Sequence, residues 1–390
     1  MGIRLKLLES LFRQKLLNKG LEGKPLTPQI VSYAVTIACN LRCVHCHADA
    51  QETASNELKL EEARQAIDAL EYLGTEALIF SGGEPLLKKD FILNLTEYCV
   101  DLGIIPAMLT NGLLLTYEVA WELKEAGLMA VGIPLDSAIP DKHDELRGIP
   151  GAFDKAVKAI NNCLDLGLDV VVTTMALTNN FHEIPKIIDF LDALGVDQVV
   201  LYDLVPTGRG KDVNDMIMSR KQRMKLINYL HRVQEDKELV FLMSGGDPLF
   251  PEIVSEMHEL NDTQPSDLLL RHFWIQSPVG CHAGIQYLSL RPNGDVYPCP
   301  FLPVKVGNIR EQSLTNIWYE SEVLKELRDR RNLKGECGSC EYRESCGGCR
   351  GRAYARNGDY LATDPVCLKE LLLKTEILPS AVHCFGWCVG

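Results

Sequence analysis

The sequence has no apolar run long enough to span a bilayer, which takes about 20 consecutive residues, anywhere in its 390 residues. It also lacks an N-terminal apolar stretch that ends at a small-residue cleavage site, so export is not expected. Basic residues are in deficit: 40 Lys and Arg stand against 53 Asp and Glu, a formal net charge of −13. These absences predict a cytoplasmic protein that does not bind nucleic acid.

A disulfide framework is not expected either, although the chain has 14 cysteines. Without an export signal the chain stays in a reducing compartment, where spaced cysteines bind metals more often than they form disulfides. We therefore interpret the spaced cysteines as metal ligands. Iron–sulfur clusters that solvent reaches are sensitive to oxygen, so an anaerobic host is expected.

The thiols nearest the N-terminus lie in the loop TIACNLRCVHCHADA, residues 36–50. Cys39, Cys43 and Cys46 have the spacing C-x3-C-x2-C. Three thiolates hold three irons of a [4Fe–4S] cluster and leave the fourth iron open to a substrate or cofactor. The alternatives are a zinc loop or buried structural thiols, but zinc usually takes C-x2-C pairs and four protein ligands.

Apolar strand-like runs alternate with amphipathic segments from residue 31 onward. Strands are expected at 31–37, 76–81, 104–109, 129–135, 168–176 and 197–204. Helices are expected near 58–73, 90–102, 115–126, 151–166 and 182–194. This alternation predicts an α/β fold, a partial (β/α)6 TIM-type barrel of parallel strands covered by helices.

Short polar motifs follow three of these predicted strands. Gly82, Gly83 and Glu84 follow the second strand, Asn111 the third, and Asp136–Ser137 the fourth. Ligand sites of parallel α/β folds lie at the carboxyl ends of strands, so these residues are expected to share one site with the thiol loop. Two glycines let the backbone approach a ligand closely, and the Glu84 carboxylate is placed to accept from an ammonium group.

The thiol loop, SGGEP at Ser81–Pro85, TNG at Thr110–Gly112 and PLDSAIPDKHDELRG at Pro134–Gly148 together resemble the radical S-adenosylmethionine enzymes. The resemblance implies that the cofactor's amino and carboxylate groups chelate the fourth iron. Reduction then yields methionine and a 5′-deoxyadenosyl radical, which abstracts hydrogen from a substrate. His45 stands where the family often has an aromatic residue before the third cysteine, near the adenine.

The same resemblance suggests roles for the polar motifs. It implies that the turn at Gly82 and Gly83 receives the methionine amino group of the cofactor. Asp136 and Ser137 are candidates for the ribose hydroxyls, with ordinary turn and helix-cap duty as the alternative. Arg209, in the turn after the sixth strand, is a candidate for the cofactor carboxylate or a substrate anion, and a surface arginine would look the same. No catalytic residue is assigned.

A second cysteine array begins at residue 281. It resembles the SPASM extension of these enzymes, which usually carries two auxiliary iron–sulfur clusters. Carried over by position, the outer cluster would be held by Cys337, Cys340, Cys346 and Cys367. The inner cluster would be held by Cys281, Cys299 and Cys349. The Cys346–Cys349 gap is two residues where the family commonly has three, and a zinc ribbon is the alternative. The stretch 346–367 resembles the mycofactocin-maturase and alternative haem-pathway branches.

The inner set is one thiolate short, and the end of the chain, HCFGWCVG, supplies two more. Cys384 and Cys388 are candidates for an additional ligand or a hydrogen-atom donor. The alternative is a frayed tail with spare thiols, since termini are often disordered. The fourth inner iron would otherwise be open to substrate or solvent.

Five regions are expected along the chain. They are an amphipathic helix at 1–30, the barrel at 31–210, a bridging region at 211–274, a small cysteine-rich α+β SPASM domain at 275–370, and a tail at 371–390. Residues 1–21 are basic and amphipathic, which suits contact with a membrane surface or a partner. A helix that closes the bottom of the barrel would have the same pattern.

These observations predict an enzyme with three [4Fe–4S] clusters and S-adenosylmethionine as cofactors. Because SPASM relatives mostly act on peptides, the first expectation is modification of a peptide or protein side chain by oxidation, decarboxylation or cross-linking. The alternatives are decarboxylation or trimming of a tetrapyrrole side chain, or modification of a lipid. An iron–sulfur electron carrier or a zinc-stabilised binding module is the non-enzyme alternative, but a pure carrier needs no open iron.

Two protein partners are expected. A low-potential electron donor, flavodoxin or ferredoxin, would reduce the first cluster. The first strand begins by residue 31, which leaves no room for a leader-peptide-binding domain before it. A separate peptide-binding protein would then supply that function.

Overall fold

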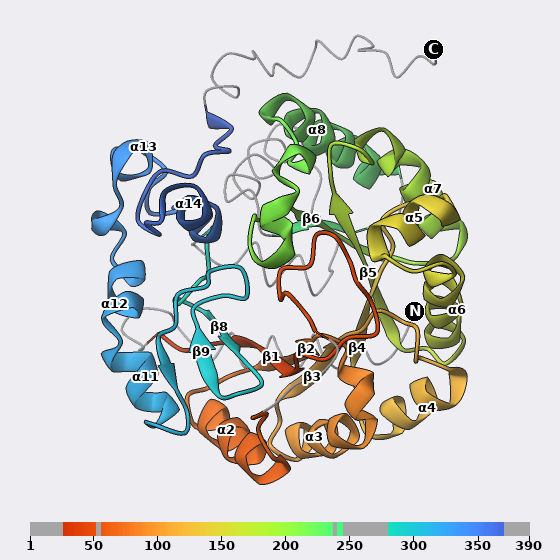
Figure 1. Cartoon of the computed structure of the whole chain (residues 1–390), viewed down its shortest axis with the longest axis horizontal. Helices are drawn as coiled ribbons and strands as arrows, with labels where there is room; N and C mark the ends of the chain where they lie inside the picture. The colour runs from red at the N-terminus through yellow and green to blue at the C-terminus, as the bar shows by residue number, and fades with distance from the viewer. Residues whose placement is uncertain (1–25, 52–55, 237–239, 245–279, 370–390) are drawn as a thin grey trace.

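The computed structural model describes residues 26–51, 56–236, 240–244 and 280–369 (Figure 1). The predicted N-terminal helix falls outside these residues except for 26–30, which lead into the first strand. The tail cysteines Cys384 and Cys388 also lie outside them. No helix within the described ranges is long and apolar enough to cross a membrane.

In the described part of the chain, ten strands form one sheet in the order β10-β9-β8-β1-β2-β3-β4-β5-β6-β7. Seven strands run parallel in chain order: β1 (Ile30–Thr36), β2 (Ala77–Gly82), β3 (Ile105–Leu109), β4 (Ala130–Pro134), β5 (Asp169–Ala176), β6 (Gln198–Asp203) and β7 (Val240–Ser244). On the other side of β1, β8 (Tyr287–Leu290) is parallel to β1, and β9 (Asp295–Tyr297) and β10 (Gly307–Asn308) follow antiparallel. The strands curve into an incomplete ring with helices outside it (Figure 1).

The helices of the ring connect successive parallel strands. They are α2 (Leu60–Tyr72), α3 (Lys89–Asp101), α4 (Tyr117–Glu125), α5 (Pro140–Arg147), α6 (Ala152–Asp165), α7 (Ile184–Ala193) and α8 (Arg220–Asp236). The C-terminal region adds α11 (Leu314–Glu320), α12 (Glu322–Arg328), α13 (Gly335–Gly338) and α14 (Arg350–Asn357). Short 3-10 turns are η1 (Pro85–Lys88), η2 (Phe181–Glu183), η3 (Gly208–Asp212), η4 (Asn214–Met216) and η5 (Arg330–Asn332).

The six predicted strands are all present within two residues of their expected bounds, and the partial-barrel α/β fold is confirmed. The structure adds two parallel strands that the sequence did not predict. β7 comes from the bridging region and extends the sheet beyond β6, while β8 comes from the cysteine-rich region and pairs with β1. α5 was also not predicted, because its sequence PDKHDELR has no apolar periodicity.

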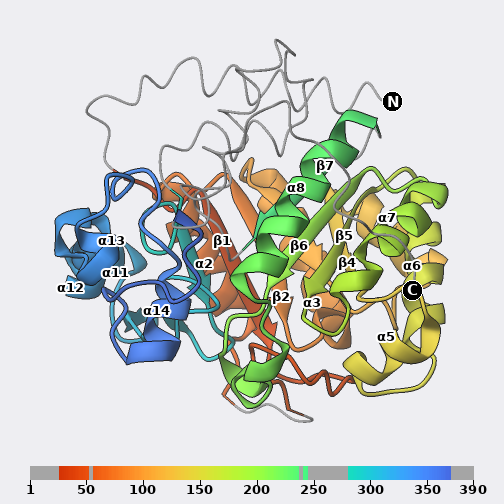
Figure 2. The ribbon, with the colours of Figure 1, turned by 90° about the horizontal axis from the view of Figure 1, so that it is seen from above.

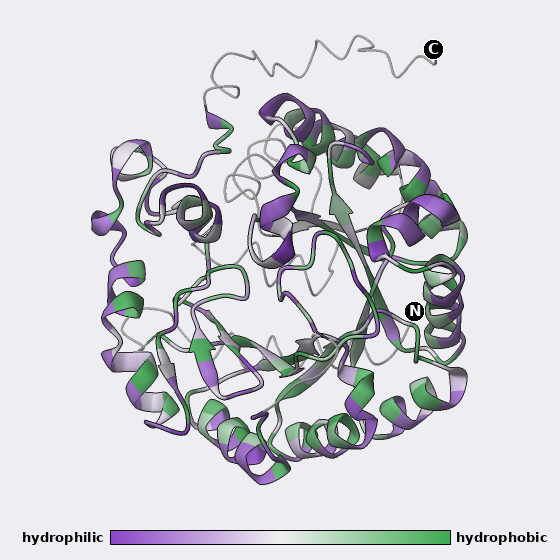
Figure 3. Ribbon diagram, in the orientation of Figure 1, coloured by the Kyte–Doolittle hydropathy of each residue, from purple (hydrophilic) through white to green (hydrophobic). Residues whose placement is uncertain are grey.

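The ring helices pack one apolar face on the sheet, as α6 illustrates. Phe153, Ala156, Ile160 and Cys163 recur at helical spacing and are all buried. Burying a side chain of the size of Ile or Phe contributes about 1.5–3 kcal/mol. Figure 3 shows this pattern in the ring helices, where hydrophobic and hydrophilic stretches alternate along each ribbon.

The cysteine-rich C-terminal region shares its core with the barrel. Trp318 on α11 is fully buried, and its Nε1 donates to the Leu26 carbonyl oxygen at 2.8 Å. The Arg328 guanidinium covers the same ring, 4.0 Å from its centroid. Figure 2 shows this region beside the β1 side of the barrel. The region is therefore attached to the barrel by the Trp318 contact and by the pairing of β8 with β1.

Candidate active site

The loop of Cys39, Cys43 and Cys46 follows β1 and is held by backbone hydrogen bonds to two other segments. The Cys39 N–H donates to the Gln51 carbonyl oxygen at 2.8 Å, where the loop returns. The Val44 N–H donates to the Leu146 carbonyl at the end of α5, 3.2 Å away. Figure 2 shows the loop at one end of the strands, with α5 and the turn after β6 at the same end. Three half-buried thiols thus lie at the carboxyl edge of the barrel.

α5 brings a cation to this loop. The Arg147 guanidinium pairs with Asp136 Oδ2 at 2.6 Å and directs Nη1 toward Cys43 Sγ at 3.9 Å. Gly148, with φ +80°, ends the helix so close to the loop that a Cβ would lie 2.7 Å from the Arg42 carbonyl oxygen. Burial alone would raise the pKa of Asp136, but Arg147 outweighs it and holds the pKa below its ordinary value. Asp136 is therefore an ionised carboxylate bound to Arg147.

Gly82 and Gly83 let the end of β2 pass directly against the loop. A Cβ at Gly83 would lie 2.0 Å from the Ala38 carbonyl oxygen, and one at Gly82 would lie 2.2 Å from that of Thr36. The Gly83 N–H donates to the Thr36 carbonyl oxygen at 2.7 Å. No side chain fits here, so both glycines are required by close backbone approach.

Glu84 is fully buried, and three protein groups donate to its carboxylate. Oε1 accepts from the Leu86 N–H at 2.9 Å and from Thr110 Oγ1 at 2.7 Å. Oε2 accepts from the Asn111 N–H at 2.8 Å, and Asn111 Nδ2 reaches Asn40 Oδ1 at 2.7 Å. Burial raises the pKa of this carboxyl. Glu84 thus joins the ends of β2 and β3, and its contact with an ammonium group stays a prediction.

Ser137 and Arg209 also have protein partners. Ser137 Oγ donates to Glu183 Oε2 at 2.7 Å and accepts from the Ile139 N–H at 3.0 Å. Arg209 donates from Nε to the Cys43 carbonyl oxygen at 3.1 Å and from Nη1 to that of Ala50 at 2.7 Å. The predicted roles toward ribose and carboxylate stay predictions, while Arg209 holds the thiol loop in place.

Two histidines flank Cys46 and carry buried nitrogens that have no hydrogen-bond partner. These atoms are Nδ1 of His45 and Nδ1 of His47. Burial lowers the pKa of His45 to about 4 and that of His47 to about 3, so both rings are neutral at pH 7. Unsatisfied buried polar atoms are costly and uncommon, which suits a site that receives a polar ligand.

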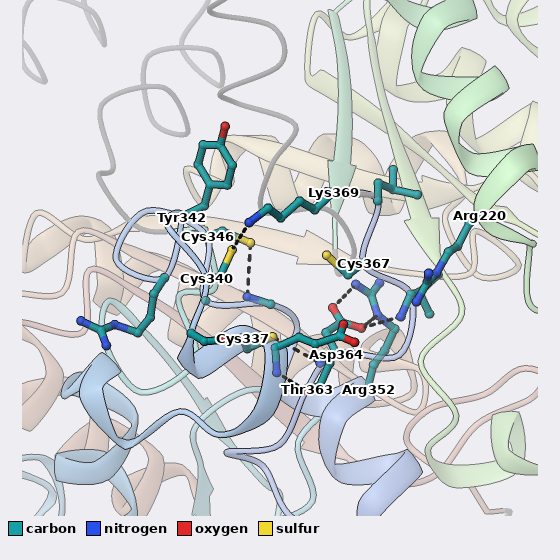
Figure 4. A pocket seen from close by; sticks show the side chains of 17 residues that line it. Arg220, Cys337, Cys340, Tyr342, Cys346, Arg352, Thr363, Asp364, Cys367 and Lys369 are labelled. Atoms are coloured by element: carbon teal, nitrogen blue, oxygen red, sulfur yellow. Dashed lines mark hydrogen bonds and ion pairs between the residues drawn. The ribbon is translucent and has the colours of Figure 1, made fainter. Parts of the chain in front are cut away.

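Four thiols of the second array line a single cavity of about 310 Å³ (Figure 4). They are the four predicted for the outer cluster: Cys337, Cys340, Cys346 and Cys367. Two of the sulfurs accept from backbone N–H groups. The Gly348 N–H donates to Cys346 Sγ at 3.4 Å, and the Asp364 N–H donates to Cys337 Sγ at 3.4 Å. Lys369 Nζ lies 3.8 Å from Cys340 Sγ. Such donors stabilise thiolate charge.

The thiols predicted for the inner cluster are also brought together. The Cys281 N–H donates to the Cys346 carbonyl oxygen at 3.2 Å, which ties the inner and outer sets. Burial raises the pKa of Cys299, and the nearby Cys281 and Cys349 raise it further. Among the described side chains, no three Cys, His, Asp or Glu residues are grouped as a single metal ion would need.

The sequence did not identify a chain of buried charges between the barrel and these thiols. Arg352 on α14 pairs with Asp364 at 2.6 Å and lies 3.5 Å from Asp203, the last residue of β6. Asp203 also pairs with Arg223 of α8. Asp364 Oδ2 accepts the Cys349 N–H at 2.8 Å. The position of Asp203 at a strand end was the available sequence signal, but one of its partners, Arg352, comes from α14, far along the chain.

The residues therefore fit the groups that the sequence implied. Cys39, Cys43 and Cys46 would hold a cluster with one open iron, and the glycine cradle and the unpartnered Nδ1 atoms of His45 and His47 lie beside it. Seven further thiols stand in two connected sets. This fold and site define an iron–sulfur enzyme whose first cluster reserves an iron for a ligand.

The comparisons with known proteins agree. Residues 33–191 match the family model described as Radical SAM superfamily, and residues 281–349 match the SPASM model, described as Iron-sulfur cluster-binding domain. The chain is 34% identical to the AdoMet-dependent heme synthase of Methanosarcina barkeri over 342 residues, which cover 87% of this chain and 96% of that protein. The chain belongs to the radical S-adenosylmethionine superfamily and carries a SPASM region.

Two further proteins are similar to the chain. Mycofactocin maturase MftC of Mycolicibacterium smegmatis is 29% identical over 349 residues, which cover 88% of this chain and 83% of that protein. The crystal structure of Streptococcus suis SuiB bound to S-adenosylmethionine covers 93% of this chain and 87% of that chain, with a TM-score of 0.68 and 18% identity. At that identity, SuiB supports the fold alone.

Proposed function

We propose that this enzyme decarboxylates carboxyl-bearing side chains of a tetrapyrrole. The observation that carries the proposal is the similarity to AdoMet-dependent heme synthase, at 34% identity over 96% of that protein. The sequence by itself favoured a peptide or protein substrate. The tetrapyrrole alternative now has more support, because MftC is more distant at 29% identity.

The reaction balances for a propionate side chain. A hydrogen atom leaves the carbon next to the macrocycle, the carboxyl group leaves as CO₂, and a vinyl group forms. One electron is released in the same sequence and needs an acceptor. S-adenosylmethionine, bound at the first cluster, supplies the hydrogen-abstracting radical. We propose that the thiol sets of Cys281 and Cys337 hold two auxiliary clusters, one of which accepts the electron.

The described residues support this division of tasks. Arg147 and Arg209 hold the first thiol loop, and Glu84 with Asn111 fixes the strand ends beside it. The inner thiol set is held against the same sheet, because β8 pairs directly with β1. An electron released near the carboxyl edge would thus have an acceptor in the C-terminal region that pairs with the first strand. A flavodoxin or ferredoxin would reduce the first cluster.

The test uses anaerobically prepared, iron-loaded protein with a chemical reductant, S-adenosylmethionine and iron-coproporphyrin III. We expect porphyrin-dependent release of 5′-deoxyadenosine and CO₂, and porphyrin products that have lost carboxyl groups. Cys43→Ala removes one first-cluster ligand and should abolish all three signals. No porphyrin-dependent release from the iron-loaded wild type would refute the proposal.

Peptide modification is the second candidate, and the similarity to MftC favours it. The same assay with host extract in place of the porphyrin distinguishes the two. If the extract stimulates 5′-deoxyadenosine release and protease treatment of the extract abolishes that stimulation, the substrate is a peptide or protein. Stimulation that survives protease would indicate the tetrapyrrole or a lipid.

A further inference from the structure

Arg291 lies at the same edge of the sheet as the first thiol loop. It directly follows β8, whose last residue, Leu290, pairs with Tyr33 of β1. Because the two strands are parallel, the chain leaves both at the same end. β1 then runs into the loop of Cys39, Cys43 and Cys46, while β8 presents Arg291. An arginine thus stands beside the first cluster site, at the carboxyl edge where ligands of parallel folds bind.

The side chain of Arg291 points toward the inner thiol set. Its Nη2 donates to the carbonyl oxygen of Pro300, at 3.1 Å, and Pro300 is the neighbour of Cys299. The guanidinium also lies 5.3 Å from the centroid of the Tyr297 ring. Arg291 thus follows the strand beside β1 and holds the segment that carries Cys299, a thiol predicted for the inner cluster.

Several buried arginines of the described chain have a carboxylate or several carbonyl oxygens as partners. Arg147 and Arg352 each pair with a carboxylate. Arg350 is fully buried and donates to the carbonyl oxygens of Gly348, Tyr360 and Ala362. Arg291 is only half-buried, and no Asp or Glu of the described residues forms an ion pair with it. A guanidinium has five N–H donors, so most of its capacity for an anion is open.

Aromatic rings from three segments gather in the same place. The Phe301 ring packs against His47 of the thiol loop, with centroids 4.8 Å apart. It also faces Tyr202 near the end of β6, at 6.3 Å. Phe301 directly follows Pro300, whose carbonyl oxygen accepts from Arg291, so these rings lie near the guanidinium. One cation and several aromatic faces suit a flat, apolar ligand that carries carboxylates.

We propose that Arg291 binds a carboxylate of the substrate, with Phe301 and Tyr202 against the body of the macrocycle. This proposal rests on the proposed tetrapyrrole function and adds the residue that fixes which edge of the substrate faces the first cluster. Arginine binds a carboxylate through two parallel hydrogen bonds, so it fixes orientation as well as position. Lysine would keep the charge and lose the second bond.

The test measures equilibrium binding without turnover, in the absence of S-adenosylmethionine and reductant. Iron-coproporphyrin III and its tetramethyl ester are titrated into iron-loaded wild type, Arg291→Met and Arg291→Lys, with absorbance as the signal. We expect Arg291→Met to weaken binding of the free acid roughly tenfold to a hundredfold, the loss typical of one charged hydrogen-bonded pair. Binding of the ester should not change, and Arg291→Lys should fall between.

Arg356→Met is the matched control, because Arg356 is an exposed arginine on α14. It should bind both porphyrins as the wild type does. Iron content and the reduction potential of the first cluster are measured on every variant. Equal binding of the free acid by wild type and Arg291→Met would overturn the role of Arg291, and a shifted potential would then assign it to cluster charge instead. Failure of the wild type to bind either porphyrin would refute the tetrapyrrole function itself.

Discussion

At the scale of the residue, the polar motifs at the strand ends act through one another. Glu84 binds the Asn111 N–H, and Asp136 binds Arg147, which reaches Cys43. Each carboxylate is buried and already hydrogen-bonded, which is how a site holds its ligand-binding groups in a fixed geometry. The acids therefore position the thiol loop and the backbone that surrounds it.

Arg147→Met should lower the reduction potential of the first cluster. The guanidinium is the cation that reaches Cys43 Sγ, and removing a positive charge disfavours the added electron. We expect iron binding to persist, while 5′-deoxyadenosine release falls roughly tenfold, since about 1.4 kcal/mol of barrier corresponds to that factor. The measurement is a redox titration of the first cluster followed by spectroscopy.

Two further variants distinguish charge from packing at this position. Arg147→Lys keeps the cation and should recover most of the potential. Arg64→Met removes an arginine of α2 that pairs with Glu61 and lies over Tyr98, and it should leave the potential unchanged. An unaltered potential in Arg147→Met at full iron content would show that Arg147 has only a structural role.

A site residue could be predicted from the sequence when its role depends on neighbouring residues, and not when its hydrogen-bond partner is far away in sequence. Gly83 and Glu84 were correctly expected at the carboxyl edge, because an apolar run and a turn are local features. Which way the side chains face was not predictable. Ser137 bonds to Glu183, 46 residues later, and Arg209 binds the loop 166 residues earlier. Such contacts are set by the fold and have no local pattern.

At the scale of the element, the helices and strands that were predicted have a local sequence pattern, and those that were missed depend on distant contacts. Amphipathic α6 and apolar β5 carry their periodicity in their own sequence. α5 is too polar to show a period, and it forms because its end docks on the thiol loop. β8 has four residues and becomes a strand by pairing with β1, more than 250 residues away.

Gly83→Ala should disrupt the junction of β1, β2 and the thiol loop. The added Cβ would lie 2.0 Å from a backbone oxygen, which no rotamer change relieves. We expect a large fall in the midpoint of thermal unfolding and loss of iron from the first site. Gly103→Ala is the control: it has φ +74° with no atom within 4 Å, so only a backbone strain of about 1–2 kcal/mol is expected. Equal midpoints for the two variants would contradict the close-approach argument.

The two thiol sets of the C-terminal region should each bind a four-iron cluster. The wild type should then contain about 12 irons per chain, since three cubic clusters have four irons each. Cys337→Ala combined with Cys367→Ala removes half of the outer ligands and should reduce iron to about eight. Iron and zinc are counted on anaerobically purified protein. A wild type with about four irons and bound zinc would support a zinc-stabilised C-terminal region instead.

The tail hypothesis is tested in the same way. Cys384→Ala and Cys388→Ala should lower iron content or turnover if the tail supplies the missing inner ligand or a hydrogen atom. Full iron content and full turnover in both variants would end that hypothesis. The inner cluster would then have an iron that is open to substrate or solvent.

At the scale of the whole molecule, the buried charges Arg223, Asp203, Arg352 and Asp364 join the barrel to the auxiliary sites. Burial alone would lower the pKa of Arg352, but Asp364 and Cys349 raise it well above its ordinary value. Asp364 accepts the Cys349 N–H and donates its own N–H to Cys337. One residue thus contacts ligands of both predicted auxiliary clusters. Buried ion pairs contribute little net stability, so a role in setting potentials is the stronger explanation.

Removing a positive charge and removing a negative charge from this row of buried residues should shift the reduction potential of the inner cluster in opposite directions. Arg352→Met removes a cation near Cys349 and should lower the potential, whereas Asp364→Asn removes an anion and should raise it. The titrations use a background of Cys39→Ala, Cys43→Ala and Cys46→Ala, which leaves only the auxiliary signals. Arg356→Met should change nothing. If these buried charges had only a packing role, both variants would lose iron or shift the potential in the same direction. An electrostatic role predicts shifts of opposite sign, because the two variants remove charges of opposite sign.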